Sequence, residues 1–85
     1  NSRQDLVKFI IVETQDDVDV VTSILEPHVT QLSLKRLETN KGNNEYIFNA
    51  EINSFDSLTT LRKEIIRSDN SAKIILMDQA GLNNI

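Results

Sequence analysis

The order in which strand-like and helix-like patterns follow one another is the feature that most constrains this chain. An almost continuously apolar, β-branched run at Leu6–Val12 predicts a strand that is buried on both faces. Val18, Val21 and Leu25 then recur at helical spacing, and Pro27 ends the helix because the residue before a proline leaves the helical region. The first third of the chain is therefore predicted to be a strand followed by a helix.

A hairpin, a second helix and a last strand follow. Apolar and polar residues alternate over Leu32–Thr39 and Tyr46–Ile52, with a turn rich in Asn and Gly between them. The second helix has an apolar stripe of four residues, Phe55, Leu58, Leu61 and Ile65. Ala72–Met77 supplies the last strand. The βαββαβ order predicts a single α+β domain over residues 1–85, a two-layer sandwich of a four-stranded antiparallel sheet with both helices on one face.

The two crossovers also predict the order of the strands in the sheet. Numbered along the chain, this order is fourth, first, third, second, and we expect the first and third strands to run parallel in the centre. We place Lys8 and Lys73 on the face away from the helices, because a charged amine is rarely buried. Because successive residues of a strand point to opposite faces, the core is then predicted to contain the apolar residues on the helix side of the strands. These are Val7, Phe9, Ile11, Leu34, Phe48, Ile52, Ile74 and Leu76.

The other face of the sheet is then more apolar than a solvated surface should be. It carries five apolar residues on three adjacent strands, Ile10, Val12, Ile47, Ile75 and Met77. Such a cluster predicts a covered surface, and the last strand is an edge with few charges to discourage pairing. We predict a symmetric homodimer that uses this face, this edge or both. A one-residue slip in the face assignment, or a C-terminal tail Leu82–Ile85 folded over the face, would also explain the pattern.

The residues that carry chemistry form no catalytic pattern. The single histidine, His28, follows a proline, and Gly42 and Gly81 are too isolated to build a nucleophile elbow or a phosphate-binding loop. The absence of cysteine excludes disulfides, thiolate zinc sites and cysteine nucleophiles. We therefore expect no catalytic residue, no cofactor and no enzymatic activity.

The charge of the chain bears on its partners. Nine Lys and Arg against thirteen Asp and Glu give a formal net charge of −4, which argues against nucleic acid and against direct binding to anionic lipid. RNA-recognition modules share the element order and stack bases on aromatic residues exposed on the sheet. Here Tyr46 and Phe48 lie at the alternating positions that are predicted to face the core. The densest acidic cluster is Glu13, Asp16, Asp17 and Asp19. Acids in a first helical turn favour the helix dipole, so we expect no metal site, although a cation stays an open alternative.

Several stretches carry a resemblance to a known family: Leu34–Thr39, the polar hairpin after it, Leu58–Leu61, Ile74–Asp78 and the turn Asp78–Leu82. The whole chain resembles an ACT-like domain, a small regulatory module of ferredoxin-like βαββαβ fold. In the layout of these stretches it is similar to the cytoplasmic C-terminal domains of MgtC-type and related uncharacterised bacterial membrane proteins. The resemblance implies a regulatory or oligomerising domain at the inner face of a bacterial membrane, with its own membrane domain as a partner. The first residue is Asn rather than Met, which fits a domain excised from a longer chain.

Two other functions are compatible with the same element order. Amino-acid-binding ACT domains resemble this chain but carry an Asp-x-Pro-Gly-like turn, whereas Glu13–Val18 has neither Pro nor Gly. A small-ligand sensor would bind its ligand near Thr14–Val18 at a subunit interface. A small acylphosphatase-like enzyme would need an anion-binding loop with a nearby Arg, and the acids of Glu13–Asp19 repel phosphate. We therefore expect a non-catalytic interaction domain.

Overall fold

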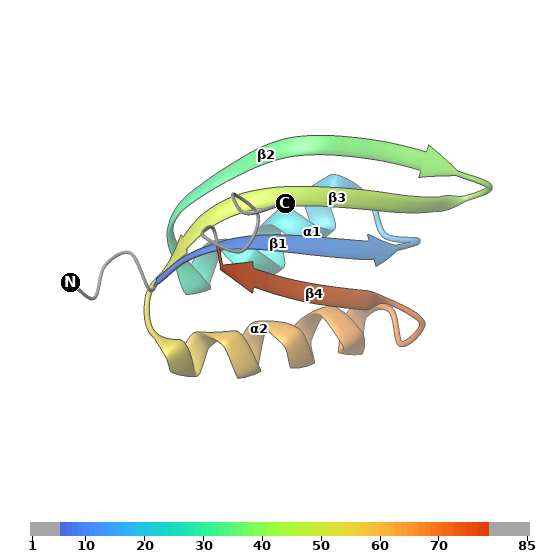
Figure 1. The fold of residues 1–85 in the computed structure, drawn as a ribbon. Helices are drawn as coiled ribbons and strands as arrows, with labels where there is room; N and C mark the ends of the chain where they lie inside the picture. Colours follow the sequence, from blue (N-terminus) through green and yellow to red (C-terminus); the bar gives the residue numbers. More distant parts are fainter. Residues whose placement is uncertain (1–5, 79–85) are drawn as a thin grey trace.

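Four strands form one antiparallel sheet in the computed structural model, which describes residues 6–78 (Figure 1). The strands are β1 (Val7–Thr14), β2 (Val29–Asn40), β3 (Asn43–Ile52) and β4 (Lys73–Asp78). The helices are α1 (Val18–Leu25), the short 3-10 helix η2 (Glu26–His28) and α2 (Phe55–Ser68). The predicted α+β class, with a four-stranded antiparallel sheet and two α-helices, is confirmed.

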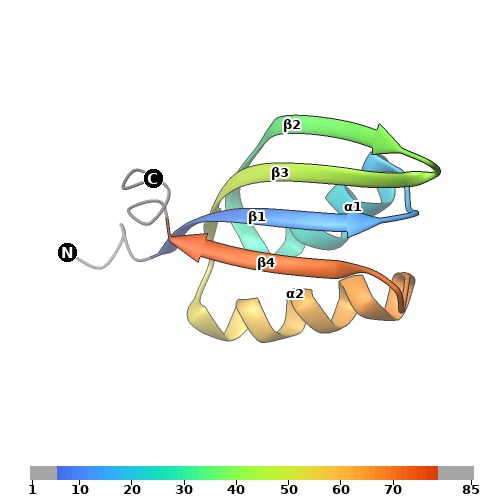
Figure 2. The same cartoon turned by 45° about the vertical axis from the view of Figure 1, so that its right-hand side comes forward.

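The strand order is β2-β3-β1-β4, which confirms the predicted order read from the other edge (Figure 2). The predicted parallel pairing of the first and third strands is wrong, because β1 pairs antiparallel with both β3 and β4. The reason is the hairpin. The connection through α1 returns the chain in the direction of β1, and the tight turn between β2 and β3 then reverses it. That turn has two central residues, Lys41 and Gly42, whose φ angles of 55° and 79° suit a two-residue hairpin.

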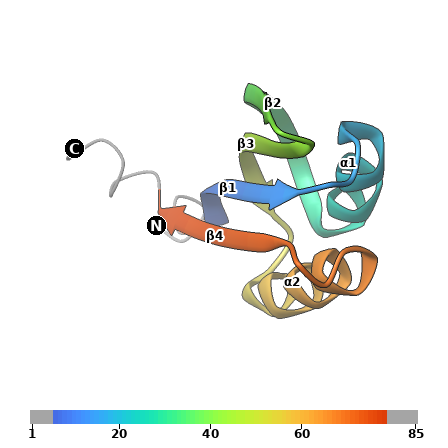
Figure 3. The same ribbon diagram turned by 90° about the vertical axis from the view of Figure 1, so that its right-hand side faces the viewer.

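The core lies between the sheet and the helices. Figure 3, which looks along the sheet, shows α1 and α2 together on one of its faces. Each helix buries two residues there, and every strand except β2 contributes at least one buried apolar side chain. The buried apolar residues are Ile10, Val12, Val21, Leu25, Tyr46, Phe48, Ala50, Ile52, Leu61, Ile65 and Ile74.

The predicted faces of β1 are reversed. Ile10 and Val12, predicted to lie on the outer face, are 0% exposed and belong to the core. Phe9 and Ile11, predicted to be core residues, are half-buried on the opposite face, as is Val7. The cause is that β1 is apolar on both faces, so its sequence does not show which face is inward.

Lys8, the polar residue from which the faces of β1 were predicted, lies on the helix side. Its side chain is only 11% exposed, and its ammonium group forms an ion pair with Asp78 at the end of β4. The same nitrogen lies 5.5 Å from the centre of the Phe55 ring. A long lysine stem can thus cross a buried region and still place its charge beside a carboxylate at the rim.

The edge strand β2 is less covered than predicted. Leu34 lies opposite buried Phe48, and therefore faces the helix side, but it remains 45% exposed. Its neighbour Leu37, opposite Tyr46, is also exposed. Both residues lie at the edge of the sheet, where α1, with only eight residues, leaves them uncovered. No helix within residues 6–78 is both long and apolar enough to cross a membrane.

Candidate functional site

The face of the sheet that the helices leave uncovered carries an apolar cluster. We call it the outer apolar patch, and it consists of Val7, Phe9, Ile11, Ile47, Ile75 and Met77. Its members adjoin across the strands: Ile11 lies opposite Ile47 on one side and opposite Ile75 on the other. Phe9 lies opposite Met77. The patch therefore spans β4, β1 and one position of β3.

Three of the five predicted interface residues, Ile47, Ile75 and Met77, lie in this patch. Ile10 and Val12 do not, since they are core residues. Sequence reasoning missed the outward positions of Phe9 and Ile11, which take their place. The alternative that Leu82–Ile85 covers this face falls outside the described residues.

Polar residues border the patch on two sides. At one end, a row across all four strands places Lys73, Glu13, Glu45 and Glu38 side by side. Toward β2, the same face continues with polar side chains, Gln31, Ser33, Arg36, Asn49 and Glu51. An apolar centre with a polar border is the usual anatomy of a protein interface. Here the centre is displaced toward β4.

The two edges of the sheet differ in how well they could pair with another strand. The pairing of β2 with β3 shifts register twice, between Val29 and Gln31 and between Leu34 and Arg36. Such irregularities distort an edge and discourage further pairing. By contrast, β4 pairs with β1 without interruption from Lys73 to Asp78. The regular edge strand, β4, is thus also a strand that carries the outer apolar patch.

The turn between β1 and α1, where a ligand sensor would bind its ligand, is held by a carboxylate of the protein itself. Asp69 Oδ2 accepts hydrogen bonds from the Thr14 hydroxyl at 2.7 Å and from the Gln15 backbone N–H at 2.9 Å. Its other oxygen accepts from the Ser71 hydroxyl and backbone N–H. These bonds, from Ser71 first and then Thr14, hold the pKa of Asp69 well below its ordinary value.

The same turn is fixed from its other side. The backbone carbonyl of Asp16 accepts hydrogen bonds from the Tyr46 hydroxyl at 2.7 Å and from the Asn44 amide at 3.1 Å. The Ser68 hydroxyl donates to the Asp16 carboxylate at 2.6 Å. Burial, together with the nearby charge of Asp17, raises the pKa of Tyr46. The polar groups of this turn are therefore used to join β1, β3 and α2 to one another.

We expect Asp69→Asn to destabilise the fold in a pH-dependent way. The folded pKa of Asp69 is below its unfolded value near 4, so its contribution is complete at neutral pH and fades as the pH falls below about 4. At pH 7 the variant should unfold at a temperature lower by on the order of 5 °C. The difference from wild type should shrink at pH 3. Thermal unfolding followed by circular dichroism at pH 7, 5 and 3 measures it.

Glu26→Gln is the matched control, because it removes an exposed carboxylate with no hydrogen-bond partner among residues 6–78. It should change the unfolding temperature little at each pH. An Asp69→Asn variant as stable as wild type at pH 7 would show that the carboxylate contributes nothing to joining the two turns.

The acidic residues considered as cation ligands are spread over different surfaces. Glu13 lies in the polar row of the outer face, Asp16 in the turn, Asp17 at the N-cap of α1, and Asp19 in its first turn. No group of three or more His, Asp or Glu within the described part of the chain is placed to hold a metal ion. His28 is within hydrogen-bond distance of Glu64, since its Nε2 lies 2.9 Å from Glu64 Oε1, and so links η2 to α2.

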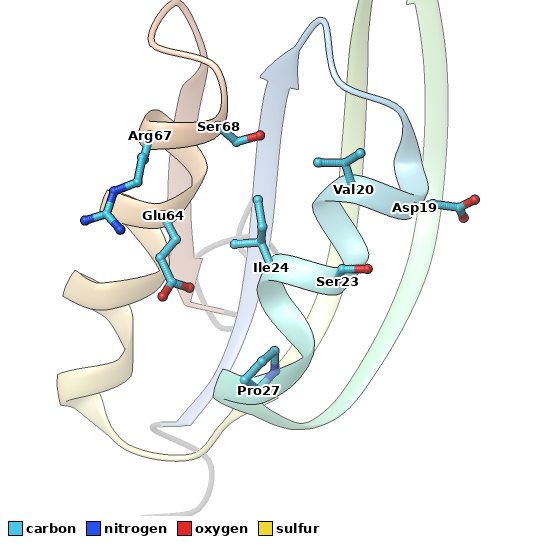
Figure 4. Close-up of a pocket in the computed structure, with 8 residues that line it drawn as sticks. All are labelled: Asp19, Val20, Ser23, Ile24, Pro27, Glu64, Arg67 and Ser68. Atoms are coloured by element: carbon cyan, nitrogen blue, oxygen red, sulfur yellow. The ribbon is translucent and has the colours of Figure 1, made fainter.

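A groove of about 720 Å³ runs between the two helices (Figure 4). Its lining is Asp19, Val20, Ser23, Ile24, Pro27, Glu64, Arg67 and Ser68. Val20 and Ile24 extend from α1 into the groove, whereas Arg67 points away from α1. Sequence reasoning missed this groove, although the apolar residues on two sides of α1 were a signal for it. Its polar side chains form no nucleophile–base pair: Glu64 is engaged by His28, and Ser68 by Asp16.

Comparisons with known proteins identify a likeness of fold alone. No family model and no curated protein matches the chain. A solved structure titled "De novo designed protein Foldit4" is similar, with 11% sequence identity and a TM-score of 0.50. The match covers 82% of this chain and 90% of that one.

Proposed function

We propose that this chain is a non-catalytic regulatory or oligomerisation domain that associates with a second copy of itself at the β4 side of the outer apolar patch. One observation carries the proposal: Ile75 is 53% exposed in the middle of a regular edge strand, next to apolar residues of β1. Burying a side chain of this size contributes on the order of 1.5–3 kcal/mol. Exposed apolar residues that cluster beside an open edge favour association.

The outer apolar patch is suited to contact with a second copy of the same chain. A two-fold interface brings the same surface of each copy together, so the surface must be compatible with itself. A strongly charged surface would repel its own copy, whereas the centre of the outer apolar patch carries no charge. The acidic row containing Glu13 and Glu45 lies at the end of the patch and can stay in water.

The finer architecture and the cellular setting belong to the same proposal. The βαββαβ element order and the strand order support a ferredoxin-like, ACT-like fold. The resemblance to MgtC-type proteins supports a cytoplasmic domain at the inner face of a bacterial membrane, with its own membrane domain as a further partner. Hydrophobic spans encoded upstream in the complete gene would be the expected finding. A metabolic enzyme domain there would instead favour a ligand sensor.

The two alternative functions have less support at the β1–α1 turn. A sensor needs free donors there, but the Gln15 N–H and the Thr14 hydroxyl already donate to Asp69. An acylphosphatase-like enzyme needs a phosphate-binding loop, and this turn contains Asp16 and Asp17. Both alternatives would require the turn to open and its charge to be compensated.

The test is the association of wild type and Ile75→Lys by sedimentation equilibrium at micromolar concentration. Lys at this position would place an unpaired charge in the interface, and we expect the dissociation constant to rise at least about 100-fold. Ser33→Lys is the matched control, because it adds the same charge to the same face of the sheet on β2, outside the patch. It should leave association unchanged.

Two results would contradict the proposal. A wild-type chain that stays monomeric throughout this concentration range ends the claim of self-association. An Ile75→Lys variant that associates as tightly as wild type shows that the contact lies elsewhere on the molecule. Circular dichroism of each variant checks that the fold is kept.

A further inference from the structure

We infer that two copies pair along their β4 edges, antiparallel and centred on Ile75, so that two four-stranded sheets become one of eight strands. This inference rests on the proposed self-association and specifies its geometry. Among the members of the outer apolar patch, only Ile75 is exposed, whereas the others are already half-buried by their neighbours. Within the patch, the residue that most lacks contacts thus lies on the edge strand β4.

The opposite edge of the sheet is less suited to such pairing. The two register shifts in β2 interrupt its regular backbone, and Lys35 and Arg36 lie at the second of them. β4 has no register shift, and its outer backbone edge pairs with no strand within residues 6–78. Figure 3 shows both helices on one face of the sheet, with α2 beside β4. Unpaired backbone N–H and C=O groups on a regular edge are a template for another strand.

The register follows from the faces of the strand. Directly opposed residues of an antiparallel pair lie on the same face, so a two-fold axis must place one residue opposite its own copy. Centring on Ile75 pairs all five residues from 73 to 77. Lys73 then lies opposite Met77 of the second copy, where its stem can pack on the thioether, and Ile74 lies opposite Leu76.

The neighbouring registers are poorer. Centring on Ile74 would pair only three residues, because β4 begins at Lys73. Centring on Leu76 would place Asp78, which forms the ion pair with Lys8, opposite Ile74 of the second copy on the helix side. In the register centred on Ile75, the ion pair lies outside the paired residues 73–77. This register also continues the row Ile47, Ile11 and Ile75 into the same row of the second copy.

The absence of cysteine from the chain makes the register directly measurable. We would introduce Ile75→Cys or Met77→Cys as the only thiol and follow disulfide-linked dimers on a non-reducing gel under mild oxidation. In the inferred register the two thiols of Ile75→Cys are directly opposed, within the Cα separation of about 4.4–6.8 Å that a disulfide needs. The two thiols of Met77→Cys would be four positions apart along the strands, about 13 Å. Ile75→Cys should therefore cross-link at least about tenfold faster than Met77→Cys.

The double variant Lys73→Cys/Met77→Cys completes the test, since these positions are opposed across the joint and should link readily. Equal or faster linking of Met77→Cys alone would overturn the register. So would preferential linking of Ile75→Cys/Met77→Cys over Ile75→Cys, which indicates centring on Leu76. Sedimentation under reducing conditions separates the two failures: a dimer that links through neither position refutes only the register, whereas the absence of any dimer refutes the proposed function with it.

Discussion

Ile10→Lys is expected to unfold the domain, whereas Ile75→Lys is expected to leave it folded. Ile10 is 0% exposed between the sheet and the helices, opposite Phe48 on β3 and Leu76 on β4. A lysine there would lose the apolar packing of the side chain and bury an ammonium group without a carboxylate. Even Ile10→Ala should cost about 2–5 kcal/mol, a large share of the stability of a domain this small.

Chemical unfolding monitored by circular dichroism gives the comparison. We expect Ile10→Ala to shift the urea midpoint strongly downward and Ile10→Lys to lack a cooperative transition. Ile75→Lys is the matched control, because it adds the same charge to the neighbouring strand on the outer face. A folded, cooperative Ile10→Lys variant would refute the assignment of the faces of β1.

The error in those faces shows where sequence reasoning loses information. Element order and strand order could be predicted because helical and alternating periods, Pro27 and the hairpin turn each mark a boundary locally. The inward face of a strand follows from alternation, and β3 alternates clearly, so Phe48 and Ile52 were predicted correctly as core residues. β1 pairs on both sides, and between Val7 and Val12 it is apolar on both faces except for Lys8, which points inward. Glu13, at the end of the strand, has the outer-face position that would have given the correct orientation.

The candidate site was predictable to a similar extent. The outward positions of Ile47, Ile75 and Met77 could be predicted. In β3 the alternation of apolar and polar residues indicated the outer face, and in β4 the flanking lysine did so. The hydrogen bonds of Asp69 could not be predicted, because Thr14 is 55 residues away and only the packed fold brings the two turns together. The exposure of Leu34 depends on the short length of α1, a tertiary effect absent from the pattern of β2.

Removal of Asp78 tests why Lys8 can occupy the helix side of the sheet. Asp78→Ala leaves the Lys8 ammonium, on a side chain only 11% exposed, without its carboxylate. The Asp78 side chain is itself 70% exposed, so water can reach this end of the sheet and partly replace the lost partner. We therefore expect a loss of about 1–3 kcal/mol, less than the roughly 3–5 kcal/mol that breaking a fully buried ion pair costs.

Lys8→Met in the Asp78→Ala background should restore most of that loss. Methionine keeps a long stem beside the Phe55 ring but has no charge to leave unpaired, and an apolar replacement of an ion pair is often neutral or stabilising. Urea unfolding of wild type, both single variants and the double variant gives the coupling energy. If Asp78→Ala proves as stable as wild type, or if Lys8→Met adds nothing to it, the ion pair does not explain how β1 tolerates a lysine facing the helices.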